Sequence, residues 1–291
     1  MAGLEDSLSI PQVVAICGKS KMAVEALDFI HYLSLSHGFD LLVVPGKGDP
    51  DLDTWQPSLR QAAGKLGVSI ASLSDLKPLA NLLLLSLEYD RILRTEHFAS
   101  SRLYNIHLSA LPAYRGCYTA TWPILNGETS AGVTLHEITD GIDEGPIVDQ
   151  ALFPLSEHVT ARSLYDHLLQ EGSRLLHKNI EALLHGTARA ETQNEARATY
   201  YKRSSLRLPE DANLPTSLTS EQMLRAVRAF NFPEYQVAKV LGRKVTAARV
   251  VARNCVQPEG YVIEANERYF VCVLSDRTAV QFTLGTDLTA G

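Results

Sequence analysis

The chain has 291 residues, a hydrophobic share of 45%, a charged share of 21% and a formal net charge of −6. This length fits one large domain or a large domain with a small appendage, and the apolar content is sufficient for a core. The negative charge argues against a nucleic-acid binder that works by neutralising phosphates.

The four cysteines are scattered without a C-x-x-C pair, so neither a zinc site nor a disulfide framework is predicted, and no metal is expected. The N-terminal stretch is acidic and short of apolar residues, which argues against a secretory signal. No apolar run reaches membrane-spanning length. We therefore expect a cytoplasmic protein without a membrane contact.

The first hundred residues alternate between short apolar runs and amphipathic stretches. Strands that alternate with helices at this rhythm predict an α/β protein with an open, mostly parallel, Rossmann-like sheet. The expected strands are 13–18, 41–45, 68–73 and 82–87, and the expected helices are 22–35 and 56–66.

The next segment continues the sheet. A strand is expected at 103–108, and a helix at 122–126. Two further strands, at 132–138 and 147–153, flank a loop that contains Asp143. Leucines recur at helical spacing in residues 159–185, which predicts a long amphipathic helix.

Polar and proline-bearing chain near residues 187–215 indicates a domain boundary. We expect a catalytic domain over residues 1–205 and a small C-terminal α+β domain over residues 206–291. In the latter, a capping box at Thr219–Gln222 predicts a helix that ends near Phe230. Three antiparallel strands are expected at 260–263, 269–274 and 278–284, and these could also support a homodimer.

Three polar residues carry the chemistry. Asn105 and His107 alternate with Ile106 on an expected strand, so their side chains share a face near its carboxyl end, where open α/β sheets bind ligands. An imidazole there can act as a general base, and an amide can donate to a developing oxyanion. Asp143 lies in a glycine-flanked loop and could orient the imidazole. These are the groups that acyl transfer to an amine requires.

Each piece alone is weak. A lone strand histidine is usually structural, as we interpret His136, and an aspartate between glycines is usually part of a turn. The order of the surrounding motifs is more specific: Asn-x-His, Leu-Pro-x-Tyr-Arg-Gly, Trp-Pro-Ile-Leu-Asn-Gly-Glu, Gly-Val-Thr-Leu-His and Asp-Gly-Ile-Asp-x-Gly-Pro-Ile.

In these motifs the chain resembles the folate-dependent formyltransferases, continuously from Asn105 to Ile147 and more loosely from Val13 to Leu103. The resemblance implies the formyltransferase fold, with Asn105, His107 and Asp143 as catalytic residues. It also implies 10-formyltetrahydrofolate as donor, held largely by backbone groups. The implied cofactor-binding residues are Ser86, Leu87, Glu88, Tyr89, Ile92, Ile138, Thr139, Asp140 and Gly141.

Three acceptor classes within this family remain open. Residues 206–291 contain ten Lys and Arg against nine Asp and Glu, a difference of +1, which is a poor footprint for methionyl-tRNA. Enzymes of the purine pathway end soon after the catalytic domain, whereas this chain continues. The stretches 53–59, 200–203 and 228–235 resemble enzymes that formylate dTDP-linked amino-dideoxy sugars, which favours an acceptor with a 3- or 4-amine and a role in lipopolysaccharide O-antigen biosynthesis. Methionyl-tRNA formyltransferase is the alternative, and a non-catalytic folate- or sugar-nucleotide-binding module is a third hypothesis.

Aromatic side chains can stack on the base of a nucleotide, and Lys or Arg side chains can bind its diphosphate. Two competing interpretations stay open: Phe230 and Phe232 could be core residues at a helix end, and Arg115 could satisfy protein groups. The candidate acceptor-binding residues are Trp55, Arg115, Lys202, Arg203, Phe230, Phe232 and Tyr235.

Overall fold

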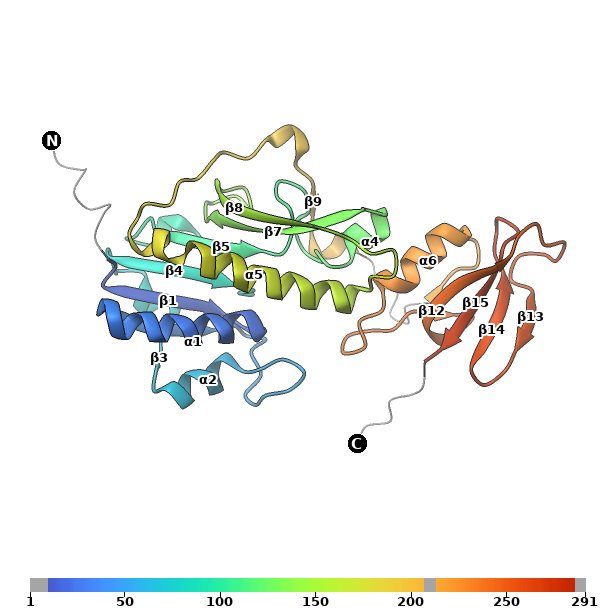
Figure 1. The fold of residues 1–291 in the computed structure, drawn as a ribbon, viewed down its shortest axis with the longest axis horizontal. Helices are drawn as coiled ribbons and strands as arrows, with labels where there is room; N and C mark the ends of the chain where they lie inside the picture. The colour runs from blue at the N-terminus through green and yellow to red at the C-terminus, as the bar shows by residue number, and fades with distance from the viewer. Residues whose placement is uncertain (1–9, 207–212, 286–291) are drawn as a thin grey trace. The chain divides into compact units, whose positions relative to one another are not determined.

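The computed structural model describes residues 10–206 and 213–285 (Figure 1). Within these ranges no helix combines the length and apolar character needed to cross a bilayer. The described chain divides into two compact units. Unit 1 comprises residues 10–117, 132–153 and 167–201, and unit 2 comprises 118–131, 154–166, 202–206 and 213–285.

Unit 1 is built on a seven-stranded sheet in the order β3-β2-β1-β4-β5-β7-β8. The first five strands of this order are parallel, and β7 is antiparallel to β5. The sheet confirms the predicted α/β class. Its strands are β1 (Val13–Gly18), β2 (Asp40–Pro45), β3 (Ser69–Ile70), β4 (Leu82–Leu87), β5 (Leu103–His107), β7 (Ser130–Glu137) and β8 (Ile147–Pro154).

Both faces of this sheet are covered. Helices α1 (Ser20–His37) and α5 (Ala161–Leu184) lie side by side across one face (Figure 1). There the ring centroids of Phe29 and His177 are 3.7 Å apart. The other face buries residues of β1, β2, β4 and β5 in one cluster with Leu76 of the short helix α3 (Leu73–Leu76). Strands buried on both faces explain the continuous apolar runs in the sequence.

Two predicted elements differ from the structure by three residues at one end, more than any other predicted element. Helix α2 spans Leu59–Leu66 rather than starting at Gln56, because Ser58 caps it and accepts from the Gln61 N–H at 3.1 Å. The strand expected at 68–73 is only Ser69–Ile70, because Ser72 and Asp75 form a capping box that starts α3.

Unit 2 packs helices against a six-stranded sheet in the order β10-β11-β12-β15-β14-β13. The capping box at Thr219 and Gln222 forms as predicted. Strand β12 was not predicted, because most of its side chains are exposed and lysine, arginine and alanine give no strand signature. The helices are α4 (Trp122–Asn126) and α6 (Ser220–Ala229), and the strands are β10 (Asn213–Leu214), β11 (Lys239–Val240), β12 (Arg243–Ala252), β13 (Val262–Ala265), β14 (Tyr269–Val273) and β15 (Ala279–Leu284).

An extended segment of residues 187–201, here called the crossing segment, follows α5 in unit 1 (Figure 1). It pairs with β8 through an Ile147–Glu191 bridge. Further along, β9 (Tyr200–Tyr201) forms a small parallel sheet with β6 (Arg115–Gly116). The sequence predicts a domain boundary near this stretch, yet its hydrogen bonds attach it to the loops that surround Asp143.

Candidate active site

Strand register aligns three polar side chains across the sheet. Ser86 on β4 is the partner of Asn105 on β5, and Asn105 is the partner of His136 on β7. Because side chains of paired residues lie on the same face, the three form a row at one end of the strands. His107 lies two residues beyond Asn105 on the same face.

His107 is buried, and two groups contact its ring. Its Nε2 lies 2.9 Å from the carbonyl oxygen of Tyr114, and its Nδ1 lies 3.5 Å from Oδ2 of Asp143. A carbonyl oxygen only accepts hydrogen bonds, so Nε2 carries a hydrogen and Nδ1 faces the carboxylate. The Tyr114 carbonyl therefore holds the ring in place, a contact that the sequence does not predict. At 3.5 Å the carboxylate acts on the ring mainly through its charge.

Asp143 occupies the loop between β7 and β8 with a positive φ of 57°. Its Oδ2 accepts a hydrogen bond from the backbone N–H of Gly116 at 2.8 Å. Its Oδ1 lies 3.9 Å from Nε2 of His136. The structure thus brings Asp143 together with His107, and its side chain is mostly buried beside both histidines.

Asn105 is oriented by His136. The Nδ1–H of His136 donates to the Glu137 carbonyl at 2.7 Å, so its Nε2 accepts from Nδ2 of Asn105 at 3.0 Å. Burial, followed by the nearby His107, lowers the pKa of His136 to about 4, which keeps it a neutral acceptor at neutral pH. The Asn105 amide nitrogen carries a second hydrogen that it can offer to an oxyanion.

Two glycines permit the close approaches around Asp143. A Cβ on Gly116, whose φ is +92°, would overlap the Tyr201 carbonyl oxygen, and a Cβ on Gly145 would overlap the Glu137 carbonyl oxygen. An amide donor, an imidazole and a carboxylate consequently share one small region at the ends of β5 and β7. Such a group can stabilise a developing negative charge and transfer a proton.

The predicted donor-binding stretches lie next to this region. Tyr89 and Ile138, one from each stretch, pack on the same core cluster. Asp140 is engaged by Thr95, whose backbone N–H and hydroxyl donate to Oδ1 at 3.1 and 2.7 Å. Ile92 is exposed, and among the described residues the buried hydroxyl of Tyr89 has no hydrogen-bond partner. An apolar surface and an unsatisfied hydroxyl fit a flat heteroaromatic ligand held by backbone groups.

The other donor candidates are distributed along the same two stretches. Ser86 and Leu87 are buried at the end of β4, and Glu88 follows with a φ of 54°. Thr139 and Gly141 lie in the loop before Asp143 and are partly exposed.

The acceptor candidates divide between the units. Trp55 and Arg115 belong to unit 1, and Lys202, Arg203, Phe230, Phe232 and Tyr235 belong to unit 2. Lys202 and Arg203 are exposed, Tyr235 is 68% exposed, and Phe232 is buried against the rings of Tyr165 and Tyr235. Trp55 is exposed in the loop after β2.

For two of these residues, burial favours the competing interpretation. Phe230 is 6% exposed within the core cluster of unit 2, so it is a core residue rather than a base contact. Arg115 is 4% exposed, and its guanidinium binds Gln193 and Glu195, so its role is to satisfy protein groups.

Sequence reasoning missed three groups at this site: the carbonyl of Tyr114, the backbone N–H of Gly116 and the side chain of Gln193. The first two are backbone groups, and the identity of a side chain does not predict what its backbone binds, apart from the glycine at position 116. Gln193 lies in a polar stretch that has no periodicity. Only the fold reveals that its side chain is buried.

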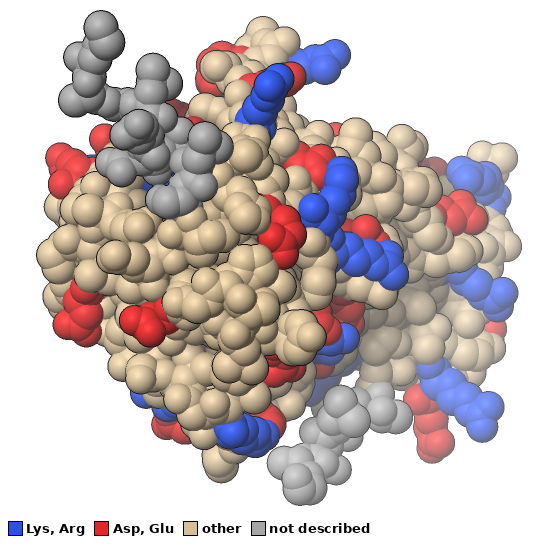
Figure 2. All heavy atoms as spheres, turned by 60° about the vertical axis from the view of Figure 1, so that its left-hand side comes forward, with Lys and Arg blue, Asp and Glu red and all other residues tan. Residues whose placement is uncertain are grey.

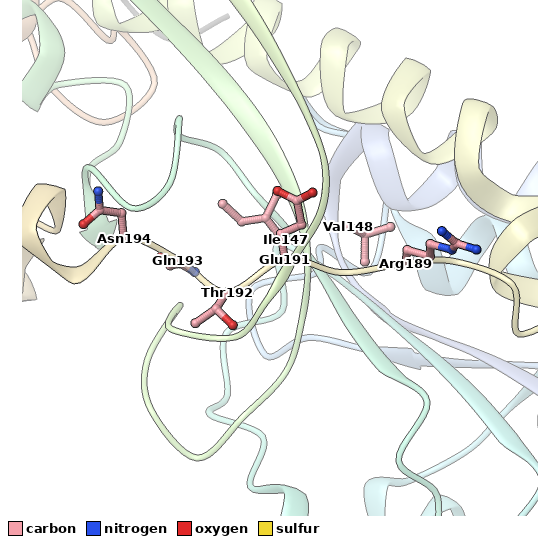
Figure 3. A pocket seen from close by; sticks show the side chains of 7 residues that line it. All are labelled: Ile147, Val148, Arg189, Glu191, Thr192, Gln193 and Asn194. Carbon is pink, nitrogen blue, oxygen red and sulfur yellow. The ribbon is translucent and has the colours of Figure 1, made fainter.

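A cavity of about 490 Å³ lies beside the crossing segment. Figure 3 shows residues 189 and 191–194 on that segment opposite Ile147 and Val148 of β8. Neither Asn105, His107 nor Asp143 lines this cavity. It is an open groove at the edge of the sheet, and we assign the chemistry to the Asn105–His107–Asp143 region instead.

Within the described ranges, one group has metal-ligand composition: His37, Glu181 and His185 hold their ligand atoms within 4.8 Å of one another. Both histidines lie 3.5 Å from Oε2 of Glu181, and two of the three residues are exposed. Ion pairing on a solvated surface accounts for this arrangement.

Comparisons with known proteins find a matching family model and similar solved structures. Residues 71–180 match the family model described as formyl transferase. Two solved structures are 33% identical with a TM-score of 0.83, and each match covers 94% of this chain. One is an N-formyltransferase from Helicobacter canadensis in complex with folinic acid and dTDP-3-aminofucose, of which 99% is covered. The other is WlaRD, a sugar 3N-formyl transferase in the presence of dTDP and 5-N-formyl-THF, of which 98% is covered. A 4-N formyltransferase from Francisella tularensis is 14% identical with a TM-score of 0.66, over 80% of this chain and 95% of its own, and shares the fold.

Proposed function

The chain belongs to the formyltransferase family, and from that membership we propose that it is a sugar N-formyltransferase. It moves a formyl group from 10-formyltetrahydrofolate to the amine of a dTDP-linked amino-dideoxy sugar. The observation that carries this proposal is the convergence of His107 on Asp143, with Asn105 held by His136 in the same region. A formyl transfer needs those three groups.

Each residue has a defined part in the proposed reaction. Asn105 donates its remaining amide hydrogen to the formyl oxygen as negative charge develops there, a role worth about 3 kcal/mol in other acyl-transfer sites. His107, with Nε2 held by Tyr114, uses Nδ1 beside Asp143 for proton transfer. The acceptor nitrogen bonds to the formyl carbon, the bond from that carbon to the folate nitrogen breaks, and the proton lost by the amine passes to that nitrogen.

The donor would be held by the stretches 86–92 and 138–141. The exposed Ile92 and the unsatisfied hydroxyl of Tyr89 fit such a ligand. When bound, the donor supplies an electrophilic one-carbon group. The two matched structures contain folinic acid or 5-N-formyl-THF, which supports a folate donor for this chain.

We further propose that the acceptor amine is at position three of the sugar. Of the two structures at 33% identity, one is in complex with dTDP-3-aminofucose and the other is a sugar 3N-formyl transferase. The product would be a formamido sugar on a nucleotide carrier. A sugar of this kind suits the assembly of a lipopolysaccharide O-antigen.

Methionyl-tRNA formylation is the competing function. On the face drawn in Figure 2, the Lys and Arg side chains of the described residues are interspersed with Asp and Glu and form no continuous basic stripe. With a net charge of −6 for the chain, this distribution gives little attraction to a polyanion.

The test is an acceptor panel. The full chain is incubated with 10-formyltetrahydrofolate and, separately, with dTDP-3-amino, dTDP-4-amino and UDP-linked amino-dideoxy sugars and with methionyl-tRNA. We expect a product heavier by one formyl group with a dTDP-3-amino sugar, with the formyl carbon on N3 by NMR. Formylation of methionyl-tRNA in preference to every sugar would overturn the proposal.

A further inference from the structure

All four hydrogen-bonding positions of the Gln193 amide are used within unit 1. Its Nε2 donates to the carbonyl oxygens of Asp143 and Gly145, each at 2.8 Å. Its Oε1 accepts from Nε and Nη2 of Arg115 at 3.2 and 2.8 Å. Gln193 is 5% exposed, so these bonds form with little competition from water.

The two donated bonds hold the backbone of the loop that carries Asp143. Asp143 has a φ of 57°, a conformation that costs a non-glycine residue roughly 1–2 kcal/mol and persists only when its surroundings impose it. Gln193 binds the carbonyl of this residue and that of Gly145, two positions later. The loop therefore has a fixed curvature at the residue whose carboxylate faces His107.

Arg115 connects this amide to a second contact with Asp143. Its guanidinium, almost fully buried, also pairs with Glu195 at 2.6 Å. The next residue, Gly116, donates its backbone N–H to Oδ2 of Asp143. The Arg115–Gln193 contact thus links two segments: the one with Gly116, which binds the Asp143 carboxylate, and the crossing segment, which binds the Asp143 backbone.

We propose that Gln193 is a positioning residue for the formyl transfer: through its two donated bonds it holds Asp143 at its distance from His107. The expected effect on kcat rests on the proposed function, whereas the placement of the Asp143 loop by Gln193 does not depend on it. The crossing segment is then part of the active-site architecture.

Gln193→Glu tests the two donors specifically. A carboxylate keeps the acceptor that Arg115 needs but cannot donate to either carbonyl. We expect kcat to fall by about ten- to a hundredfold at pH 8, with the KM for the donor within about twofold. Lowering the pH protonates the introduced carboxylate and restores one donor, so the ratio of variant to wild-type kcat should rise toward acid. The exposed neighbour Thr192→Ala is the matched control and should leave kcat unchanged.

A second readout is independent of catalysis. The Gly116 amide proton, which is bonded to a carboxylate, should shift in the NMR spectrum of Gln193→Glu at pH 8 and move back toward its wild-type position at low pH. If wild-type protein formylates no acceptor while this shift is seen, the proposed function fails and the positioning role stands. An unchanged Gly116 signal, or a kcat ratio that stays the same at every pH, would overturn the inference.

Gln193→Asn provides a variant that buries no charge, in case the glutamate prevents folding. It keeps the amide but is one methylene shorter, so it cannot reach both Arg115 and the loop carbonyls. We expect a similar loss of kcat without the recovery in acid. Wild-type kcat in this variant would count against a positioning role.

Discussion

The backbone N–H of Gly116 donates to Oδ2 of Asp143 over 2.8 Å, although the two residues are 27 positions apart. The bond forms because Gly116, at a φ of +92°, lets β6 run directly against β9. It places a backbone donor on the carboxylate that faces His107.

Gly116→Ala tests this arrangement. The added Cβ would overlap the Tyr201 carbonyl, and the residue would keep an unfavourable φ, so the β6–β9 contact must open. We expect a destabilisation of about 1–3 kcal/mol and, because the donor to Asp143 moves, a fall in kcat of about tenfold or more. Thermal unfolding and steady-state kinetics on the same preparation measure both effects.

The exposed Gly242→Ala is the matched control. It also changes a glycine with positive φ, +75°, but no neighbouring atom of the described residues lies within 4 Å of its Cβ position. It should lower stability without lowering kcat. If Gly116→Ala behaves like this control, the Gly116 bond has no role in placing the carboxylate.

His136 predicts a pH dependence of stability. Its pKa is lowered to about 4 in the folded protein, mainly by burial, against about 6.5 in the unfolded chain. Below pH 6.5 the unfolded state therefore binds more protons, and the free energy of unfolding falls as pH decreases toward 4. The full loss is about 3 kcal/mol.

His136→Gln removes this titration and keeps a side-chain acceptor near Asn105. Chemical denaturation from pH 7.5 to 4 should show the stability of the wild type falling more steeply than that of the variant, with most of the difference gained between pH 6.5 and 4. Parallel curves would show that His136 does not remain neutral in the folded protein.

The sequence predicted those parts of the fold that leave a periodic signal. Strand β4 at Leu82–Leu87 and helix α4 at Trp122–Asn126 have the expected bounds, because apolar runs and helical spacing report burial directly. Strand β12 was missed because its exposed, charged side chains pair through the backbone. At the site, the motifs identified Asn105, His107 and Asp143, while the groups that orient them, such as the Tyr114 carbonyl, depend on how distant loops meet.

Variants of two aromatic residues near the end of α6 distinguish a role in acceptor binding from a role in core packing. Tyr235 is 68% exposed, whereas Phe230 is buried in the core of unit 2. If Tyr235 stacks on the nucleotide base, Tyr235→Ala should raise the KM for the dTDP-sugar about tenfold, since stacking is worth about 1–3 kcal/mol, with little change in stability. Phe230→Ala should instead cost about 3–5 kcal/mol of stability.

Denaturation and acceptor-dependent kinetics distinguish these effects. A Tyr235→Ala enzyme with wild-type KM would remove this residue from the acceptor site. A Phe230→Ala protein of wild-type stability would contradict its assignment to the core.

The most direct test of the account is single-turnover formyl transfer from 10-formyltetrahydrofolate to a dTDP-3-amino sugar by wild-type protein and by Asp143→Asn. Asparagine has the size of aspartate and can still accept from Gly116, but it lacks the charge that faces Nδ1 of His107. We predict that the variant folds with wild-type stability and that its rate of transfer is lower by about 10²–10⁴-fold. A variant that transfers the formyl group at the wild-type rate would contradict the assignment of the reaction to this group of residues.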